Sequence, residues 1–196
     1  MYADTSTSLK IAGTDLAISQ TTDYPNDGKI KISLTPKKPS SFKVHLRIPT
    51  WAGNQFVPGK LYKYVNQKKE SWSLTVNGSK TQAKVEKGFA IIERKWKKGD
   101  QIILDLPMPL RINQCDKRVE ENHNRLAFTR GPFVLCAEEI DNGGATQRFF
   151  LNQEKMETKY SLAKVKLPSG SFSQVKTMAN AVNESGGDED KSLSLI

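Results

Sequence analysis

Polar and apolar residues alternate with a period of two in several short stretches of this chain. Residues 42–48 show the alternation most clearly, and residues 29–34 and 71–76 repeat it. This period with a single apolar face is typical of antiparallel strands that pack on one side and face water on the other. A second layer has to cover the apolar face. The pattern therefore predicts an all-β chain folded as an antiparallel, jelly-roll-like β-sandwich.

Turn-forming residues separate these stretches and predict chain reversals. Residues 89–96 and 101–106 are rich in β-branched and aromatic side chains and flank Lys98-Gly-Asp100, which is the sequence pattern of a β-hairpin. Asn77-Gly78 is the strongest short hairpin signal in the chain. The segment Asp23-Tyr-Pro-Asn-Asp-Gly28 marks a further reversal, because proline fixes one backbone angle and glycine accepts a positive φ.

The second half of the chain is less regular than the first. We expect strands at 125–130 and 133–138, weaker strands at 160–167 and 172–175, a charged connection at 110–124 and a helix at 176–182. The predicted domains are a β-sandwich over residues 1–114 and a second, incomplete β unit, part of a second small sandwich, over residues 115–196. A flexible segment of glycine and acidic residues is expected near 184–191. Both ends lie in strand-like sequence, so we expect a piece of a longer polypeptide.

The chain carries a net charge of +9 over 196 residues, which would suit a polyanionic partner. Its basic residues are spread along the strands, for example at Lys29, Lys31, Lys43 and Arg47, mostly in the polar phase. A solvated outer face therefore explains the charge better than an anion site, and polyanion binding stays an alternative. There is no phosphate-binding loop or nucleic-acid motif, so we expect no nucleic acid as partner. No membrane span or signal peptide is visible, so no membrane is expected either.

The residue types that perform catalysis or bind metals form no recognisable set in this sequence. Cys115 and Cys136 make no CxxC pair and have only the two histidines of the chain as nitrogen partners, so a metal site is not expected. Cys136 lies in an apolar run, which favours a buried free thiol over an isolated disulfide. Glu138 and Glu139 could form a glycosidase pair only if both faced one substrate, and neighbouring residues of a strand point to opposite faces. We predict no catalytic residue.

Among the three tryptophans, Trp51 is the one whose role the sequence leaves most open. Trp72 shares the apolar phase of its strand and Trp96 ends a strand, so both are expected in the core. Trp51 follows Pro49 in a loop at the end of a strand, where binding residues commonly lie. A contact with another domain suits it best, with simple packing and sugar stacking as alternatives. Arg47, Pro49 and Trp51 are therefore the predicted residues for a contact with another domain or with a ligand.

Several motifs of the chain occur in a characteristic order. They are Tyr24-Pro-Asn-Asp-Gly28, Leu46-Arg-Ile-Pro-Thr-Trp-Ala52, Val76-Asn-Gly78, Gly88-Phe-Ala-Ile-Ile-Glu-Arg-Lys-Trp-Lys-Lys-Gly-Asp100, Leu106-Pro-Met108 and Asn124-Arg-Leu-Ala-Phe-Thr-Arg-Gly-Pro132. In this order they resemble the C-terminal half of glycoside hydrolase family 127, the β-L-arabinofuranosidase type. The inserted Val57-Pro-Gly-Lys-Leu-Tyr62 is similar to a segment common in relatives from gut bacteria. The resemblance runs from about residue 2 to residue 139 and then weakens.

The resemblance carries expectations about function. In that family an N-terminal (α/α)6 barrel performs retaining hydrolysis with a cysteine nucleophile held by zinc and with glutamates as acid/base and ligand. The present sequence contains no such barrel, which implies a non-catalytic β-sandwich region that packs against and supports it. Zinc is implied for the catalytic domain alone, and no catalytic or metal-binding residue is transferred to this sequence.

The resemblance also implies partners. The (α/α)6 barrel of the same parent chain is the expected partner, and plant-type arabinan glycans and a second copy of the chain stay open as further partners. An independent carbohydrate-binding module is the alternative function. The expected setting is a bacterium, with the periplasm and the cytoplasm both open.

Overall fold

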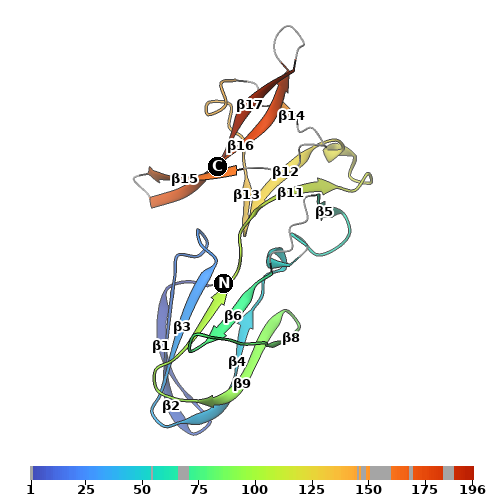
Figure 1. Cartoon of the computed structure of the whole chain (residues 1–196). Helices are drawn as coiled ribbons and strands as arrows, with labels where there is room; N and C mark the ends of the chain where they lie inside the picture. Colours follow the sequence, from blue (N-terminus) through green and yellow to red (C-terminus); the bar gives the residue numbers. More distant parts are fainter. Residues whose placement is uncertain are drawn as a thin grey trace. The chain divides into compact units, whose positions relative to one another are not determined.

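The structure is a computed structural model that describes residues 2–53, 55–65, 71–144, 146, 149–150, 160–167, 170–182 and 188–196. Strands dominate these residues (Figure 1), and η1 (Thr50–Ala52) and η2 (Glu120–Asn122) are short 3₁₀ turns. No helix in the described ranges is long and apolar enough to cross a membrane. The prediction of an all-β, antiparallel chain is confirmed.

In chain order, the strands are β1 (Thr5–Ile11), β2 (Thr14–Thr22), β3 (Lys29–Pro36), β4 (Ser40–Arg47), β5 (Tyr62–Tyr64), β6 (Ser73–Val76), β7 (Ser79–Lys80), β8 (Lys84–Glu86), β9 (Phe89–Trp96), β10 (Asp100–Asp105), β11 (Leu110–Cys115), β12 (Leu126–Arg130), β13 (Phe133–Leu135), β14 (Phe149–Phe150), β15 (Tyr160–Leu167), β16 (Gly170–Val182) and β17 (Asp188–Leu195). The chain divides into two compact units. The first comprises Met1–Lys63 and Lys69–Pro109, and the second comprises Tyr64–Lys68 and Leu110–Ile196. Residues 110–114, which the sequence-based division placed in the first domain, therefore lie in the second unit.

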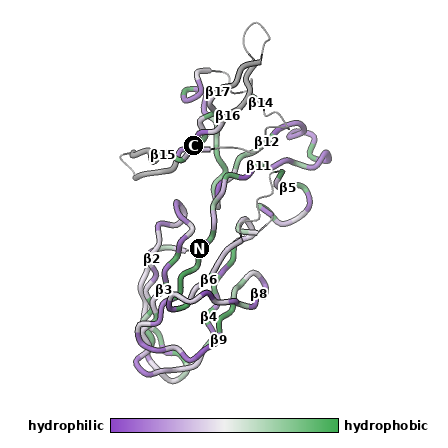
Figure 2. Tube along the Cα trace, viewed as in Figure 1, coloured by the Kyte–Doolittle hydropathy of each residue, from purple (hydrophilic) through white to green (hydrophobic). Residues whose placement is uncertain are grey.

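Two antiparallel sheets form the first unit and share one apolar core. The larger sheet has the strand order β1-β2-β3-β10-β6-β7, and the smaller has the order β4-β9-β8. Leu34 and Leu104 of the larger sheet and Leu46 and Trp96 of the smaller sheet are buried in the same cluster. Every second residue of β3 is buried, as a strand with one apolar face requires. Figure 2 accordingly shows hydrophobic and hydrophilic residues interspersed along these strands.

The predicted hairpin over residues 89–106 is wrong, although both of its strands exist. β9 pairs with β4 and β8, whereas β10 pairs with β3 and β6, so the two strands belong to different sheets. Each strand turns an apolar face, with Trp96 on β9 and Leu104 on β10, into the core between the sheets. Burial of these faces separates the strands, and the turn between them becomes a corner of the sandwich. The predicted hairpin at Asn77-Gly78 is confirmed, because β6 pairs with β7.

Asp100 and Asn77 hold this corner in place. The Asp100 carboxylate accepts hydrogen bonds from the Lys97 N–H and the Asn77 side-chain amide, both at 2.9 Å. Asn77 in turn accepts the Gln101 N–H at 2.8 Å. The corner and the β6–β7 turn are therefore fixed to each other by side chains that can bond to backbone in tight turns.

The second unit contains β13, β12 and β11 in one sheet, which Tyr64 at the end of β5 joins, and another sheet of order β14-β16-β15, in which β17 also pairs with β16. Its core includes Leu110, Ile112, Phe128 and Val175. The expectation of a connection throughout 110–124 is wrong, because residues 110–115 form β11 and bury Leu110 and Ile112. The strand could not be recognised from the sequence, because its buried residues include the polar Arg111 and Asn113 and the hydrophobic alternation is lost.

The predicted helix over residues 176–182 is also wrong. These residues continue β16, which pairs with β17 over Val175–Val182 and with β15 up to Thr177. Ladder hydrogen bonds on both sides of a strand outweigh the weak helix preference of a few alanine and methionine residues. Residues 184–187 of the predicted flexible segment lie outside the described residues, and residues 188–191 belong to β17 instead.

Both cysteines are free thiols, and Cys136 is exposed. The expectation of a buried thiol at Cys136 is therefore wrong, although no disulfide forms. β13 ends one residue before Cys136, whose backbone N–H and C=O both bond to Ile196, at 2.7 and 2.8 Å. Glu138 and Glu139 follow the strand and lie at a turn, where the Asn142 amide donates to the Glu138 carbonyl at 2.7 Å.

Candidate contact surface

Arg47, Pro49 and Trp51 lie together where β4 ends. Pro49 has φ −64° and ψ 151° and immediately precedes η1, which contains Trp51. A proline lacks the N–H that a ladder needs, so it stops β4 and redirects the chain. The sequence therefore places an arginine, a proline that turns the chain and a tryptophan on alternate positions at one end of the smaller sheet.

The Arg47 side chain is held by the turn between β8 and β9. Its Nη1 donates to the Gly88 carbonyl at 2.9 Å and to the Lys87 carbonyl at 3.3 Å. The guanidinium carbon lies 5.3 Å from the centre of the Phe89 ring, in the range of a cation–π contact. Gly88, at φ +78°, leaves the necessary space, because a Cβ there would lie 1.8 Å from Arg47 Nη1. Arg47 is thus fixed in position while its side chain stays exposed.

Trp51 belongs to an aromatic cluster with Tyr2 and Tyr24. The Trp51 and Tyr24 rings are stacked, with centroids 6.5 Å apart and an interplanar angle of 21°. Tyr2 meets Tyr24 edge-on at 6.1 Å. The Tyr2 hydroxyl donates to the Arg47 carbonyl at 2.7 Å, which joins this cluster to the arginine. We refer to Tyr2, Tyr24, Arg47, Pro49 and Trp51 as the contact surface.

Sequence reasoning missed the two tyrosines of this surface. Tyr24 lies in a turn motif and Tyr2 is separated from Arg47 by 45 positions, so no local pattern connects either one to Trp51. Tyr2 is buried, and both Tyr24 and Trp51 are partly buried against the core of the first unit. Trp51 therefore packs within its own unit and keeps part of its ring accessible.

Burial changes the acidity of both tyrosines. It raises the pKa of Tyr2 to about 12, with a smaller raising effect from Tyr24 and a lowering effect from the Arg47 charge. Burial also raises the pKa of Tyr24, and a hydrogen bond with Trp51 partly offsets the rise. Both hydroxyls therefore stay neutral in the folded chain over the physiological pH range.

The free energy of unfolding is expected to fall as the pH rises from about 10 to about 12. Tyr2 is protonated in both states below pH 10. Above it the unfolded chain, in which tyrosine has its ordinary pKa of 10.0, loses the proton before the folded chain does. The stability lost over this range amounts to at most about 2.7 kcal/mol. Urea unfolding at several pH values measures this loss. Tyr2→Phe should flatten the decline, and an unchanged slope in that variant would show that Tyr2 is not its source.

No three His, Cys, Asp or Glu side chains converge on a metal position in the part of the chain that the structure describes. Cys115 is only partly buried, and its thiol donates to the Asn122 carbonyl at 3.0 Å. Cys136 is exposed and lies on another segment. These two cysteines do not fit the donor set of a cysteine-bound zinc ion.

The fold and the contact surface define an all-β region of two units that presents an aromatic and arginine-bearing face. Comparison with protein families identifies it further. Residues 1–108 match the model described as the β-L-arabinofuranosidase, GH127 middle domain, and residues 110–184 match the glycoside hydrolase family 127 C-terminal domain. The chain belongs to glycoside hydrolase family 127.

Solved structures of the family contain the same fold. A GH127 β-arabinofuranosidase superposes with a TM-score of 0.89 at 32% identity, with 100% of this chain and 31% of that chain covered. A GH127 β-L-arabinofuranosidase from Geobacillus stearothermophilus T6 gives a TM-score of 0.84 at 26% identity, with 100% and 30% covered. The non-reducing end β-L-arabinofuranosidase of Bifidobacterium longum is 29% identical over 132 residues, which are 66% of this chain and 18% of that protein. The chain thus spans less than a third of these relatives.

Proposed function

We propose that this chain is a non-catalytic accessory region of a β-L-arabinofuranosidase-like glycoside hydrolase. In this proposal it packs against a catalytic (α/α)6 barrel elsewhere in the parent chain and supports it. The barrel, with zinc and a cysteine nucleophile, supplies the chemistry of retaining hydrolysis. The contribution of the present chain is a rigid β platform.

Coverage is the observation that carries the proposal. All of this chain aligns with a GH127 β-arabinofuranosidase at a TM-score of 0.89, yet it accounts for 31% of that protein. The matching models describe middle and C-terminal domains of the family. A region that occupies the later domains of a hydrolase, and whose described residues assemble no metal cluster, suits a supporting role better than a catalytic one.

The contact surface has the composition of a docking site. Tryptophan, tyrosine and arginine are the residue types that contribute most strongly at protein interfaces. Here Trp51 is stacked on Tyr24, and Arg47 is fixed by two carbonyl groups, so both anchors are ordered before any partner binds. Order of this kind lowers the entropic cost of docking.

Trp51→Ala tests the docking proposal through two measurements of stability. In the isolated chain the variant loses only packing within the first unit. In the full-length parent it should lose an additional interface contribution of about 2 kcal/mol. Urea unfolding of both proteins gives the difference between the two losses.

Lys31→Ala is the matched control, because Lys31 is exposed on the outer face of the larger sheet. Lys31→Ala should change the free energy of unfolding little in either protein. Equal losses for Trp51→Ala in the isolated chain and in the parent would refute an interface at Trp51, and the accessory role would then need another docking surface.

A further inference from the structure

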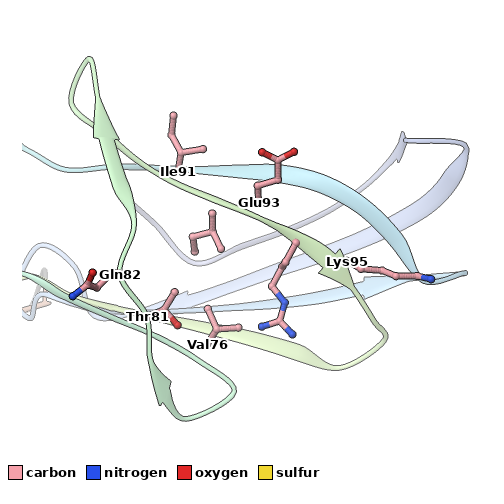
Figure 3. A pocket seen from close by; sticks show the side chains of 8 residues that line it. Val76, Thr81, Gln82, Ile91, Glu93 and Lys95 are labelled. Atoms are coloured by element: carbon pink, nitrogen blue, oxygen red, sulfur yellow. The ribbon is translucent and has the colours of Figure 1, made fainter.

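A groove of about 560 Å³ opens at one edge of the sandwich in the first unit (Figure 3). β6 contributes Val76 to its lining, and the crossing segment between β7 and β8 contributes Thr81 and Gln82. β9 contributes the stretch from Ile91 to Lys95. The groove lies entirely within the first unit and involves none of the residues of the contact surface.

The groove exists because β9 pairs with another strand along only one of its two edges over most of its length. β8 pairs with β9 at Phe89, Ala90 and Ile91. β4 pairs with the whole of β9, and no other strand of the described residues pairs with β9 beyond Ile91. Figure 3 shows Ile91 and Glu93 extending away from Val76 and Thr81. Because side chains alternate along a strand, Ile92 and Arg94 point to the opposite side of β9, toward the groove.

Arg94 is the charged residue on this inward face. It lies on the same side of β9 as Ala90, Ile92 and Trp96, which are 0%, 6% and 0% exposed. Arg94 itself is exposed. Its guanidinium carbon lies 5.3 Å from the centre of the Trp96 ring. Arg94 thus presents to the groove a guanidinium group that is oriented by the Trp96 ring.

The nearby carboxylates are already engaged. Glu93, the acidic residue of the lining, pairs with Lys43 at 3.4 Å on the outer face. Asp100 accepts the hydrogen bonds of the corner from Lys97 and Asn77, and despite burial these bonds and the charge of Arg94 lower its pKa. Within the described part of the chain, Arg94 forms no ion pair at salt-bridge distance. Its charge is available to an anion that enters the groove.

The lining favours a sugar that carries a carboxylate. A guanidinium binds a planar carboxylate with two parallel hydrogen bonds. The Gln82 amide can bond to hydroxyl groups, and buried Val76 and Ile92 offer an apolar floor to C–H groups. A polypeptide strand suits the groove less, because an inward charge on an edge strand opposes strand pairing.

We propose that this groove binds an oligosaccharide of uronic acid residues, with Arg94 as the carboxylate-binding residue and Gln82 beside it. The site does not depend on the accessory role. The net charge of +9 favours the approach of such an anion but does not select a position for it.

Titration of the isotope-labelled chain with trigalacturonate, followed by NMR, tests the proposal. Saturable shifts are expected at the backbone amides of Gln82, Arg94 and Lys95. Arg94→Gln should weaken binding by about tenfold or more, because it removes a charge-assisted pair. A neutral arabinan trisaccharide should bind at least about tenfold more weakly than trigalacturonate, because it offers Arg94 no carboxylate.

Lys31→Gln removes the same charge from the outer face of the larger sheet and should leave binding within about twofold, because exposed charges at a distance are screened. An equal loss in Lys31→Gln and Arg94→Gln would indicate diffuse attraction and overturn the proposal, as would equal binding of the neutral sugar or no shift at all. Gln82→Ala provides a second variant if Arg94→Gln does not fold, with an expected loss of about threefold.

Discussion

Replacing Gly28 with alanine is expected to destabilise the first unit by at least about 3 kcal/mol, which is a large part of the stability of a domain. A Cβ at this position would lie 1.8 Å from the Leu106 carbonyl oxygen and 2.7 Å from its carbonyl carbon. Both atoms belong to the backbone and cannot rotate away. The Leu106 N–H also donates to the Gly28 carbonyl at 3.0 Å, so any displacement costs a hydrogen bond as well.

Urea unfolding followed by tryptophan fluorescence measures this effect. Gly13→Ala is the control, because no atom lies within 4 Å of a Cβ at Gly13 and only its φ of +73° opposes a side chain. That conformation costs about 1 kcal/mol. If Gly28→Ala were as stable as Gly13→Ala, the close approach of the two backbones would not exist in solution.

The period-two pattern predicted strands far better than it predicted their partners. Residues 42–48 and 29–34 alternate strictly, and the structure contains β4 and β3 there. The same pattern cannot say whether consecutive strands pair by their edges or pack face to face. β9 and β10 therefore looked like a hairpin, although the core between the sheets separates them.

Strands with polar residues buried on the second face were harder to find. β11 buries Arg111 and Asn113 as well as Leu110 and Ile112, so it shows no alternation of hydrophobicity. The Asn113 amide nitrogen donates to the Thr129 hydroxyl at 2.9 Å on the neighbouring strand, a contact that the sequence alone does not reveal.

The contact surface was only partly readable from the sequence. A proline followed closely by a tryptophan at a strand end is a local signal, and the contact role that it suggests for Arg47, Pro49 and Trp51 stays a prediction. Tyr2 and Tyr24 join them through contacts between distant parts of the chain. The role proposed for Arg94 could not be predicted from the sequence either, because the direction of its side chain follows from the pairing and burial of its neighbours.

The central claim is that cleavage of the glycosidic bond occurs in another domain of the parent protein. The most direct measurement is the release of arabinose from a β-L-arabinofuranoside by this purified chain. We expect no release above the enzyme-free rate. The Bifidobacterium longum relative, named as a non-reducing end β-L-arabinofuranosidase, is the positive control. Turnover that follows the purified chain and disappears in Gly28→Ala would contradict the account, because folded residues of this chain would then perform the hydrolysis.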